Sequence, residues 1–260
     1  MKATRKNLTW PIFIISLPDC TDRREPLIKD LNKAGLDFQI FPAVDAREGV
    51  PNEYEHMIDR DGAILALRRE MSEGEFGCAL SHQLIYKKVI DNGLPGAIIF
   101  EDDARLMPQA GRALTSNFFS RYDFTQFNYG FARIPRFALT RKTETDEVST
   151  IRLLCNSGLA SGYAVSRRGC KYISQTSLRL TLPADWPCDL RPIKPRITLP
   201  KLVTAPQQNI AQSTVAASRK EKKEAMDKLA ISKQKISTAQ ARNPRSKILK
   251  HFAWLYSNSL

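Results

Sequence analysis

The chain has 260 residues, of which 42% are hydrophobic, so it can build a core and is not a disordered protein. Its net charge of +13 indicates a polyanionic partner, such as nucleic acid, anionic lipid headgroups or a phosphorylated substrate. The five cysteines form no CxxC pair, which predicts reduced thiols in a cytosolic protein rather than a disulfide framework or a zinc knuckle. No stretch approaches the ~20 apolar residues of a membrane-spanning helix, and the apolar run 12–17 is too short for a signal peptide.

The positive charge is concentrated near the carboxyl terminus. From residue 215 onward the chain has eleven Lys and Arg and three acidic residues, so this segment carries +8 of the +13. We therefore expect one domain in residues 1–214 and a basic, partly amphipathic helical tail in residues 215–260. Within the tail, residues 245–256 combine basic side chains, an apolar helical face, Trp and Tyr, which is typical of a helix at a membrane surface. Docking of this segment on the protein's own body is the alternative.

The first elements form a strand, a helix and a second strand. Residues 11–17 contain a continuous apolar run, which predicts a buried strand. The helix that follows has a natural stop at Gly35, and residues 38–41 predict the next strand. This order is one strand–helix–strand unit of a parallel sheet.

Two arginines lie at the start of that first helix. Asp22 and Glu25 have the spacing of a capping box, which places Arg23 and Arg24 in the first turn. Arginines beside a positive helix terminus suit a phosphate, although two solvated surface arginines would fit the pattern equally well.

A second helix is predicted after residue 75. Ser72 and Glu75 form a capping-box pattern, and apolar residues then recur at helical spacing until residues 92–93 end the helix. Ser81 and His82 lie within it. A histidine in an amphipathic helix is more often a structural residue than a ligand, so this helix by itself does not identify a site.

An acidic cluster follows the next predicted strand. Residues 97–100 form a short apolar run that ends in Glu101, Asp102 and Asp103. Ligands of open α/β sheets bind outside the carboxyl ends of the strands. Three carboxylates at that edge repel one another, and a hard divalent cation removes the repulsion, because carboxylate oxygen suits magnesium or manganese. We interpret the cluster as a metal site, with a solvated acidic turn as the alternative.

The rest of the sequence continues to alternate between helices and strands. The predicted elements are a helix over 108–120, a strand over 124–131, an exposed loop or hairpin over 140–150, a strand over 159–165, a helix capped by Ser166, and an edge strand over 195–203. A glycine inside the strand over 159–165 marks the close approach of a ligand or another backbone.

Residues 182–189 predict a rigid, irregular loop. Prolines flank Asp185, Trp186 and Asp189 in this segment, and Pro187 disfavours helix at the residue before it. Rigid loops with acids and an aromatic ring can supply a general base and a surface for stacking on a sugar. A surface turn with Trp186 in the core is the alternative.

Four stretches together resemble glycosyltransferase family 25, the bacterial lipooligosaccharide glycosyltransferases. They are Ile-Ile-Ser-Leu at 14–17 with the arginines at 23–24, Gly-Cys-Ala-Leu-Ser-His at 77–82, Phe-Glu-Asp-Asp-Ala at 100–104 and Gly-Tyr-Ala-Val-Ser at 162–166. Pro-Cys-Asp at 187–189 looks like that family's later Pro-x-Asp motif. The order and spacing match over about residues 10–210, whereas residues 190–195 depart from the family.

The resemblance implies an α/β fold of the GT-A-like type, in which one nucleotide-sugar-binding domain has a mostly parallel, mixed central sheet flanked by helices. It implies an inverting transfer that depends on Mn²⁺ or Mg²⁺. The implied donor is a UDP-sugar, most often UDP-galactose, with UDP-glucose as the alternative. The implied acceptor is a lipid-linked lipooligosaccharide. We therefore expect a cytoplasmic enzyme that is peripheral on the anionic cytoplasmic face of the inner membrane through its tail.

The resemblance also implies roles for the acidic residues. Asp103 would bind the metal directly, Glu101 would support it, and Asp102 would face the ribose or share the ion. An inverting transfer needs one carboxylate to take the proton of the acceptor hydroxyl. That base would be Asp189, with Asp185 as the second candidate.

The donor pocket follows from the same motifs. Ser16, Arg23 and Asp45 would line the nucleotide site. Ser81 and His82 would lie near the pyrophosphate or the donor sugar, which raises the expectation that His82 is functional.

Three other classes of protein fit the sequence less well. An aspartyl phosphatase would have a D-x-D motif after the first strand, and a nucleotidyltransferase would usually have a glycine-rich loop there; neither is present in residues 16–19. A nucleic-acid-binding protein would explain the charge. The positive residues of this chain are mostly in the tail, however, and its body lacks interleaved aromatic and basic residues. We therefore expect no nucleic-acid partner.

Overall fold

The structure is a computed structural model that describes residues 10–135 and 140–205. The predicted tail over 215–260, with its proposed membrane-surface helix, lies outside the described residues. Among the residues that the structure describes, no helix is long and apolar enough to cross a membrane.

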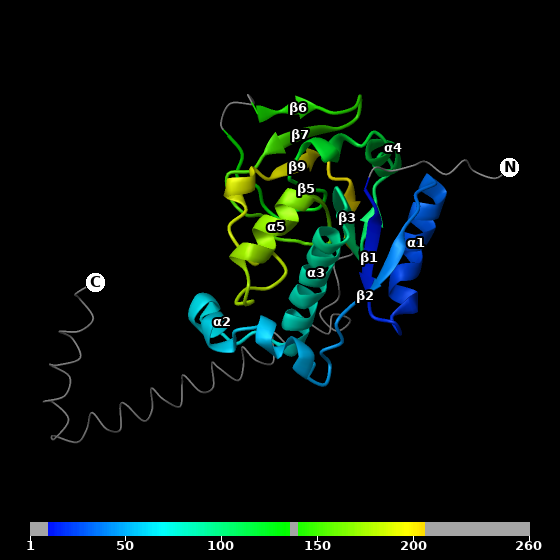
Figure 1. The fold of residues 1–260 in the computed structure, drawn as a ribbon. Coiled ribbons are helices and arrows are strands. Elements are labelled where there is room, and N and C mark those ends of the chain that lie inside the picture. Colours follow the sequence, from blue (N-terminus) through cyan, green and yellow to red (C-terminus); the bar gives the residue numbers. More distant parts are fainter. Residues whose placement is uncertain (1–9, 136–139, 206–260) are drawn as a thin grey trace, which may run out of the picture.

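Eight strands form one central sheet in the order β2-β1-β3-β8-β5-β9-β7-β6 (Figure 1). Their bounds in that order are Gln39–Pro42, Ile12–Ser16, Gly96–Glu101, Gly162–Ser166, Phe124–Gln126, Arg196–Leu199, Ser149–Arg152 and Lys142–Thr143. The pairings make six strands run in one direction, whereas β8 and β7 run in the other. The predicted mixed sheet of mostly parallel strands is therefore confirmed. A second sheet pairs β4, Arg105–Leu106, with β10, Val203–Thr204.

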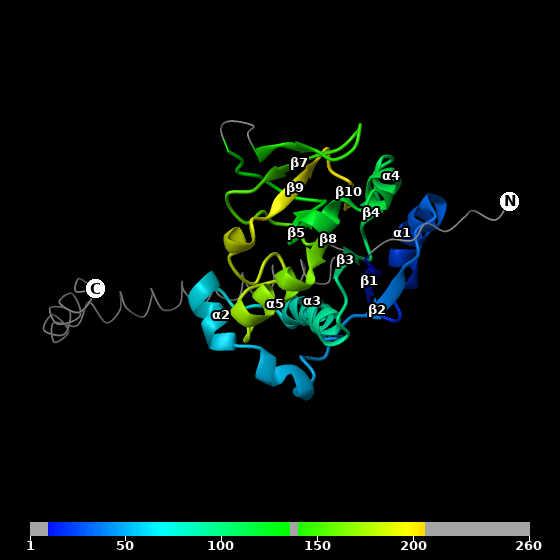
Figure 2. The ribbon, with the colours of Figure 1, turned by 45° about the horizontal axis from the view of Figure 1, so that its top comes forward.

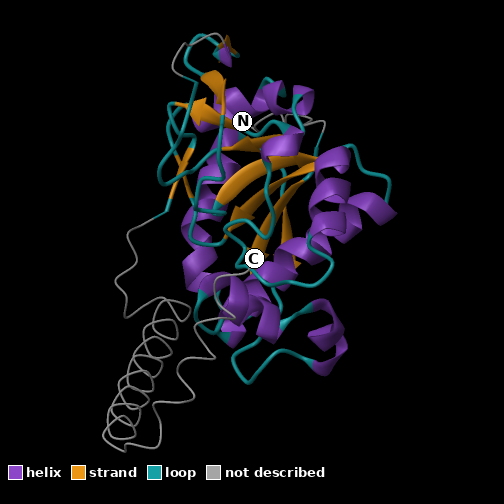
Figure 3. Cartoon of the chain, turned by 90° about the vertical axis from the view of Figure 1, so that its left-hand side faces the viewer, coloured by secondary structure: helices purple, strands orange, loops and turns teal. Residues whose placement is uncertain are grey.

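Helices cover both faces of the sheet. The α-helices are α1 (Thr21–Ala34), α2 (Arg60–Leu67), α3 (Glu73–Asp91), α4 (Ala110–Thr115) and α5 (Arg167–Thr176), and the 3₁₀ helices are η1 (Asn52–Met57), η2 (Phe118–Arg121) and η4 (Arg191–Ile193). Figures 1 and 2 show α3 and α5 side by side. In Figure 3 the strands lie between helices. This is the flanked α/β arrangement that the alternation of elements predicts.

The apolar runs of the central strands divide between two cores. In β1, Phe13 and Ile15 pack in a cluster with residues of α3 and α5, whereas Ile12 and Ile14 pack in a second cluster with residues of α1 and α4. Successive side chains of a strand point to opposite faces, so a strand covered on both faces must be apolar at every position. This explains why the sequence shows continuous runs here rather than alternation.

Most local signals in the sequence correspond to the observed ends of elements. Ser72 and Glu75 form the reciprocal capping box at the start of α3, and Ser166 caps α5 by accepting from the Gly169 amide. Gly35 ends α1 in the left-handed conformation. The capping box at Asp22 is wrong, because α1 begins after Cys20 and Asp22 lies inside its first turn.

Three predicted elements differ from the structure. The helix over 108–120 is divided into α4 and η2, because Asn117 between them has a left-handed φ of 55°. The strand over 124–131 ends at Gln126, since the backbone of Phe127 turns toward Gly162 and residues 202–203. The strand over 195–203 is not at an edge: β9 pairs with β5 on one side and β7 on the other.

The parallel order β2-β1-β3 brings three strand ends together. Ser16 ends β1, the segment 43–47 follows β2, and Glu101 ends β3 at the same edge of the sheet. Gly77 of α3 allows close packing here, because a Cβ at this position would lie 2.9 Å from both the Val44 oxygen and the Ala46 Cβ. The fold therefore places α3 directly against the segment that follows β2.

Candidate functional site

A cavity of about 360 Å³ lies at this carboxyl edge of the sheet. Of the ten site residues predicted from the sequence, eight line it: Ser16, Arg23, Asp45, Ser81, Glu101, Asp102, Asp103 and Asp185. His82 lies behind the wall, in contact with Glu101, and Asp189 does not line the cavity. The structure thus brings together residues from five separate segments of the chain.

Asp102 and Asp103 are buried in the cavity wall and share one arginine. Arg23 Nε lies 2.8 Å from Asp102 Oδ1, and an Arg23 terminal nitrogen lies 3.0 Å from Asp103 Oδ2. Ser16 donates its hydroxyl to Asp102 Oδ2 at 3.1 Å. Burial raises the pKa of Asp102 to about 6; Arg23 opposes the rise, whereas the neighbouring carboxylates of Asp103 and Glu101 add to it. The wall therefore holds more negative charge than Arg23 alone compensates.

Arg24, the second arginine at the start of α1, has a different role. Arg24 donates to the carbonyl oxygens of Leu17 and Pro18 and to the Ser16 hydroxyl, so it fixes the turn between β1 and α1. The sequence left both arginines as candidates for a phosphate. The structure separates them, because Arg23 faces the carboxylates and Arg24 faces the backbone.

Asp45 and Ser81 also have partners within the protein. Asp45 is paired with Arg47, which also reaches Asp19 at 2.6 Å, and these charges lie at the exposed rim. The Ser81 hydroxyl donates to the Gly77 carbonyl at 2.6 Å and accepts from the Val44 amide at 2.8 Å. Ser81 therefore ties α3 to the segment that follows β2 and holds this part of the wall in place.

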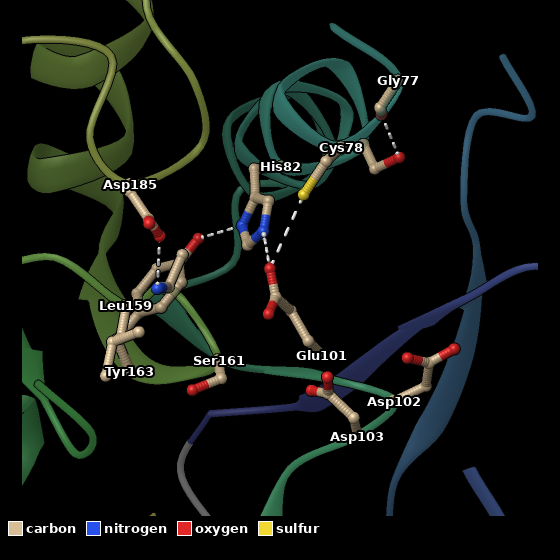
Figure 4. A network of polar contacts seen from close by, with 12 residues as sticks. Gly77, Cys78, His82, Glu101, Asp102, Asp103, Leu159, Ser161, Tyr163 and Asp185 are labelled. Atoms are coloured by element: carbon tan, nitrogen blue, oxygen red, sulfur yellow. Dashed lines mark hydrogen bonds and ion pairs between the residues drawn. The ribbon is translucent and has the colours of Figure 1, made fainter. Parts of the chain in front are cut away.

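Glu101 turns away from the two aspartates toward α3 (Figure 4). Its Oε1 lies 3.6 Å from Cys78 Sγ and 3.5 Å from His82 Nε2. The other ring nitrogen of His82 lies 2.6 Å from the Tyr163 hydroxyl, which lies 2.6 Å from the Tyr86 hydroxyl. Although burial opposes ionisation, the contact with His82 holds the pKa of Glu101 below its ordinary value. In this structure Glu101 belongs to the His82 network rather than to a cage of three adjacent carboxylates.

The loop over 182–189 brings one of its two acids to the cavity. Asp185 accepts from the Ala160 amide at 2.9 Å and lines the cavity. Asp189 forms an ion pair with Arg191 at 2.8 Å, and its pKa is lowered by the hydrogen bonds from Arg191. Trp186 is 2% exposed, with its ring centroid 4.8 Å from that of Phe124, so the predicted sugar-stacking surface is wrong at this residue.

Sequence reasoning missed two features of this site. Cys78 lines the cavity, although its thiol was expected to be one of several unremarkable reduced cysteines. A usable signal was its spacing from His82, since residues four apart on a helix lie on the same face. Tyr163 was missed because the residues of a strand do not reveal which helix they will contact.

A divalent cation, as implied by the resemblance, fits Asp102 and Asp103. Both are acidic oxygen donors, both are buried at the cavity wall, and the desolvation that raises the pKa of Asp102 is relieved by a nearby cation. Arg23 occupies the same two carboxylates, so a cation would share them with Arg23 or displace it.

Comparison with known proteins identifies the family. The model of "Glycosyltransferase family 25 (LPS biosynthesis protein)" matches residues 9–187. The "Lipooligosaccharide biosynthesis protein lic2B" of Haemophilus influenzae is 26% identical over 175 residues, which are 65% of this chain and 64% of that protein. The "Lacto-N-neotetraose biosynthesis glycosyltransferase LgtE" of Neisseria meningitidis is 26% identical over 179 residues, 66% of this chain and 62% of that protein.

An animal relative matches over a similar part of the chain. The "Procollagen galactosyltransferase 1" of Danio rerio is 27% identical over 186 residues, which are 67% of this chain and 30% of that protein. The chain thus spans less than two thirds of the length of each of these three relatives. The family match itself covers well over half of the chain, including the cavity walls from β1 to the loop that carries Asp185. The chain belongs to glycosyltransferase family 25.

Proposed function

We propose that this protein is an inverting, metal-dependent glycosyltransferase with a GT-A-like domain. It would transfer galactose from UDP-galactose to a lipooligosaccharide acceptor. The observation that carries the proposal is the pair of buried carboxylates, Asp102 and Asp103, in the cavity at the carboxyl edge of β1, β2 and β3. The names of the three relatives support sugar transfer, since two refer to lipooligosaccharide or lacto-N-neotetraose biosynthesis and one to a galactosyltransferase.

Asp103 and Asp102 would hold the cation, Mn²⁺ or Mg²⁺. When bound, that ion supplies positive charge to the diphosphate leaving group. The placement of Glu101 against His82 favours a supporting role for Glu101, through the charge it adds to the wall.

The remaining residues bind and orient the donor in this proposal. Arg23 offers a guanidinium beside the carboxylates, where it can contact a phosphate oxygen. Ser16 and Asp45 line the same cavity on the side of β1 and β2, which is where the nucleotide would lie. Ser81 and His82 support the wall from α3, Ser81 through its hydrogen bonds to Gly77 and Val44 and His82 from behind Glu101.

The general base of the proposal is Asp185 rather than Asp189. Asp185 lines the cavity, whereas Asp189 is held by Arg191 outside it. In an inverting transfer the base accepts the proton of the acceptor hydroxyl as that oxygen attacks the anomeric carbon and the diphosphate leaves. The pKa of Asp189 is lowered by its hydrogen bonds from Arg191, which makes its carboxylate a weaker base than an ordinary aspartate.

The positive charge of the tail supports a location for this activity at a membrane surface. Its net charge of +8 in residues 215–260 would attract the protein to the anionic cytoplasmic face of the inner membrane, with each basic residue near the surface contributing about 1 kcal/mol. Deleting residues 215–260 should release the protein from sedimenting anionic vesicles and leave transfer to a soluble acceptor intact. Binding that survives the deletion would place the membrane contact in the body.

A thermal-shift panel of nucleotide sugars, each with and without manganese, tests the function. UDP-galactose should raise the melting temperature more than UDP-glucose or GDP-mannose, and manganese should increase the shift. Asp103→Ala should lose the manganese-dependent part, whereas Asp91→Ala, at an exposed site paired with Lys87, should keep it. A larger shift in melting temperature with UDP-glucose than with UDP-galactose would identify UDP-glucose as the donor. No shift with any nucleotide sugar, together with DNA binding by the tail-deleted body, would replace the proposal with the nucleic-acid alternative.

A further inference from the structure

A second group of possible metal ligands lies in the cavity wall, apart from the two aspartates. Cys78 and His82 are one turn apart on α3, and Glu101 ends β3. One ligand atom of each residue lies within 4.8 Å of the other two. In residues 10–135 and 140–205, these three form the one group of His, Cys, Asp and Glu that gathers so closely.

The two separations that involve the Glu101 oxygen match tetrahedral zinc. With the usual zinc bond lengths, a tetrahedral site separates its nitrogen and oxygen ligands by about 3.4 Å and its sulfur and oxygen ligands by about 3.6 Å. His82 Nε2 lies 3.5 Å from Glu101 Oε1, and Cys78 Sγ lies 3.6 Å from the same oxygen. The Glu101 oxygen therefore already lies at a tetrahedral separation from both of its neighbours.

The orientation of the His82 ring suits it to bind a metal ion. His82 is 2% exposed, and its buried Nε2 makes no hydrogen bond of good geometry although it points toward Cys78 and Glu101 (Figure 4). Its Nδ1 is engaged by the Tyr163 hydroxyl at 2.6 Å, and Tyr86 in turn contacts Tyr163. Metal-binding histidines are typically oriented in this way, with the second ring nitrogen held by a partner that fixes the ring and its tautomer.

We propose that Cys78, His82 and Glu101 form a binding site for a divalent cation of borderline softness, of which Zn²⁺ is the natural representative. A thiolate, an imidazole and a carboxylate suit Zn²⁺ better than Mg²⁺ or Mn²⁺, whose preferred ligands are oxygen atoms. Because Cys78 and Glu101 line the cavity, the fourth coordination position faces it and takes water or a ligand atom. The site is separate from the Asp102 and Asp103 pair and does not depend on the proposed sugar transfer.

Cobalt spectroscopy on the full-length, metal-free protein tests this site. One equivalent of Co²⁺ should give a thiolate-to-cobalt charge-transfer band and the intense visible bands of a tetrahedral site, and Zn²⁺ should remove them. Cys78→Ser should lose the charge-transfer band. Cys20→Ser is the matched control, since Cys20 lines the same cavity outside the group, and it should keep the band. Serine is nearly isosteric with the partly exposed Cys78, so an unchanged melting temperature should accompany the loss.

Two further variants sharpen the result. Tyr163→Phe removes the hydroxyl that orients His82 and should weaken Co²⁺ binding about 10–100-fold. Asp103→Asn should leave the cobalt spectrum unchanged, because Asp103 belongs to the other pair. A wild-type protein without the charge-transfer band, or a band that persists in Cys78→Ser or disappears in Asp103→Asn, would overturn the proposal. None of these measurements uses a sugar donor, so the outcome is independent of the proposed function.

Discussion

Arg23 Nε lies 2.8 Å from Asp102 Oδ1, which joins the first turn of α1 to the turn that follows β3. The ion pair is set in a wall where burial and two neighbouring carboxylates disfavour the charged form of Asp102. The site therefore carries an electrostatic cost that a bound cation would relieve, and this relation leads to the first two predictions.

Asp102→Asn should stabilise the ligand-free protein at neutral pH. The pKa of Asp102 rises from 3.8 to about 6 on folding, so the folded state binds the proton more tightly. The wild-type protein should therefore lose stability as the pH rises from about 4 through 6, by a maximum of about 3 kcal/mol. Asparagine carries no such charge. The difference in melting temperature between variant and wild type should grow over this range and be constant above pH 7, as measured by differential scanning fluorimetry. A constant difference from pH 4 to pH 8 would show that Asp102 has an ordinary pKa.

Arg23→Gln should weaken binding of the nucleotide sugar. Loss of a charge-assisted hydrogen bond costs about 1.5–3 kcal/mol, which corresponds to roughly 10–100-fold in the dissociation constant. Isothermal titration calorimetry with UDP-galactose measures the effect. Lys29→Gln is the control on the same helix, because Lys29 is an exposed residue paired with Glu25. Equal affinity in Arg23→Gln and Lys29→Gln would remove Arg23 from the donor site.

Asp185→Asn and Asp189→Asn form a matched pair that identifies the general base. Asparagine at position 185 retains an oxygen to accept from the Ala160 amide, so the loop should keep its conformation. We expect Asp185→Asn to lower kcat about 10²–10⁴-fold with little change in donor affinity, and Asp189→Asn to stay within a few-fold of wild type. A larger loss of kcat in Asp189→Asn than in Asp185→Asn would identify Asp189 as the base. Steady-state transfer assays and donor titrations on both variants decide between them.

Gly77→Ala should damage the cavity through packing alone. The new Cβ would lie 2.9 Å from the Val44 carbonyl oxygen and from Ala46, so the segment 43–47 must move. Overpacking of this kind costs about 1–3 kcal/mol, and both the melting temperature and the donor affinity should fall. Gly130→Ala is the control, since a Cβ there meets nothing within 4 Å. An unaltered melting temperature in Gly77→Ala would mean that α3 and the segment after β2 are less tightly packed than described.

Much of the fold could be predicted from local sequence. Continuous apolar runs identified β1 and β3, because both faces of these strands are covered. The Ser72 capping box marked the start of α3, because it depends on residues three positions apart. The acids after β3 could be assigned to a site because strand ends in a parallel arrangement meet at one edge.

The sequence could not show how the side chains of that site divide among partners. Glu101, Asp102 and Asp103 are adjacent in the chain, yet Glu101 contacts His82 and Cys78 while the two aspartates contact Arg23. The direction of a side chain at the end of a strand depends on the turn that follows and on groups far away in sequence. The same reason put Asp185 in the cavity and left Asp189 outside it.

The amino-acid sequence by itself determined where most of the central strands and their helices lie, which strand ends in carboxylates and which family the motifs resemble, because these depend on short-range patterns. Only the tertiary structure decided that Trp186 is a core residue, that β9 is internal to the sheet, and that Cys78 approaches Glu101. Each of these relations joins segments distant in the chain, and their distances are set by how α3 and the later strands pack on the sheet.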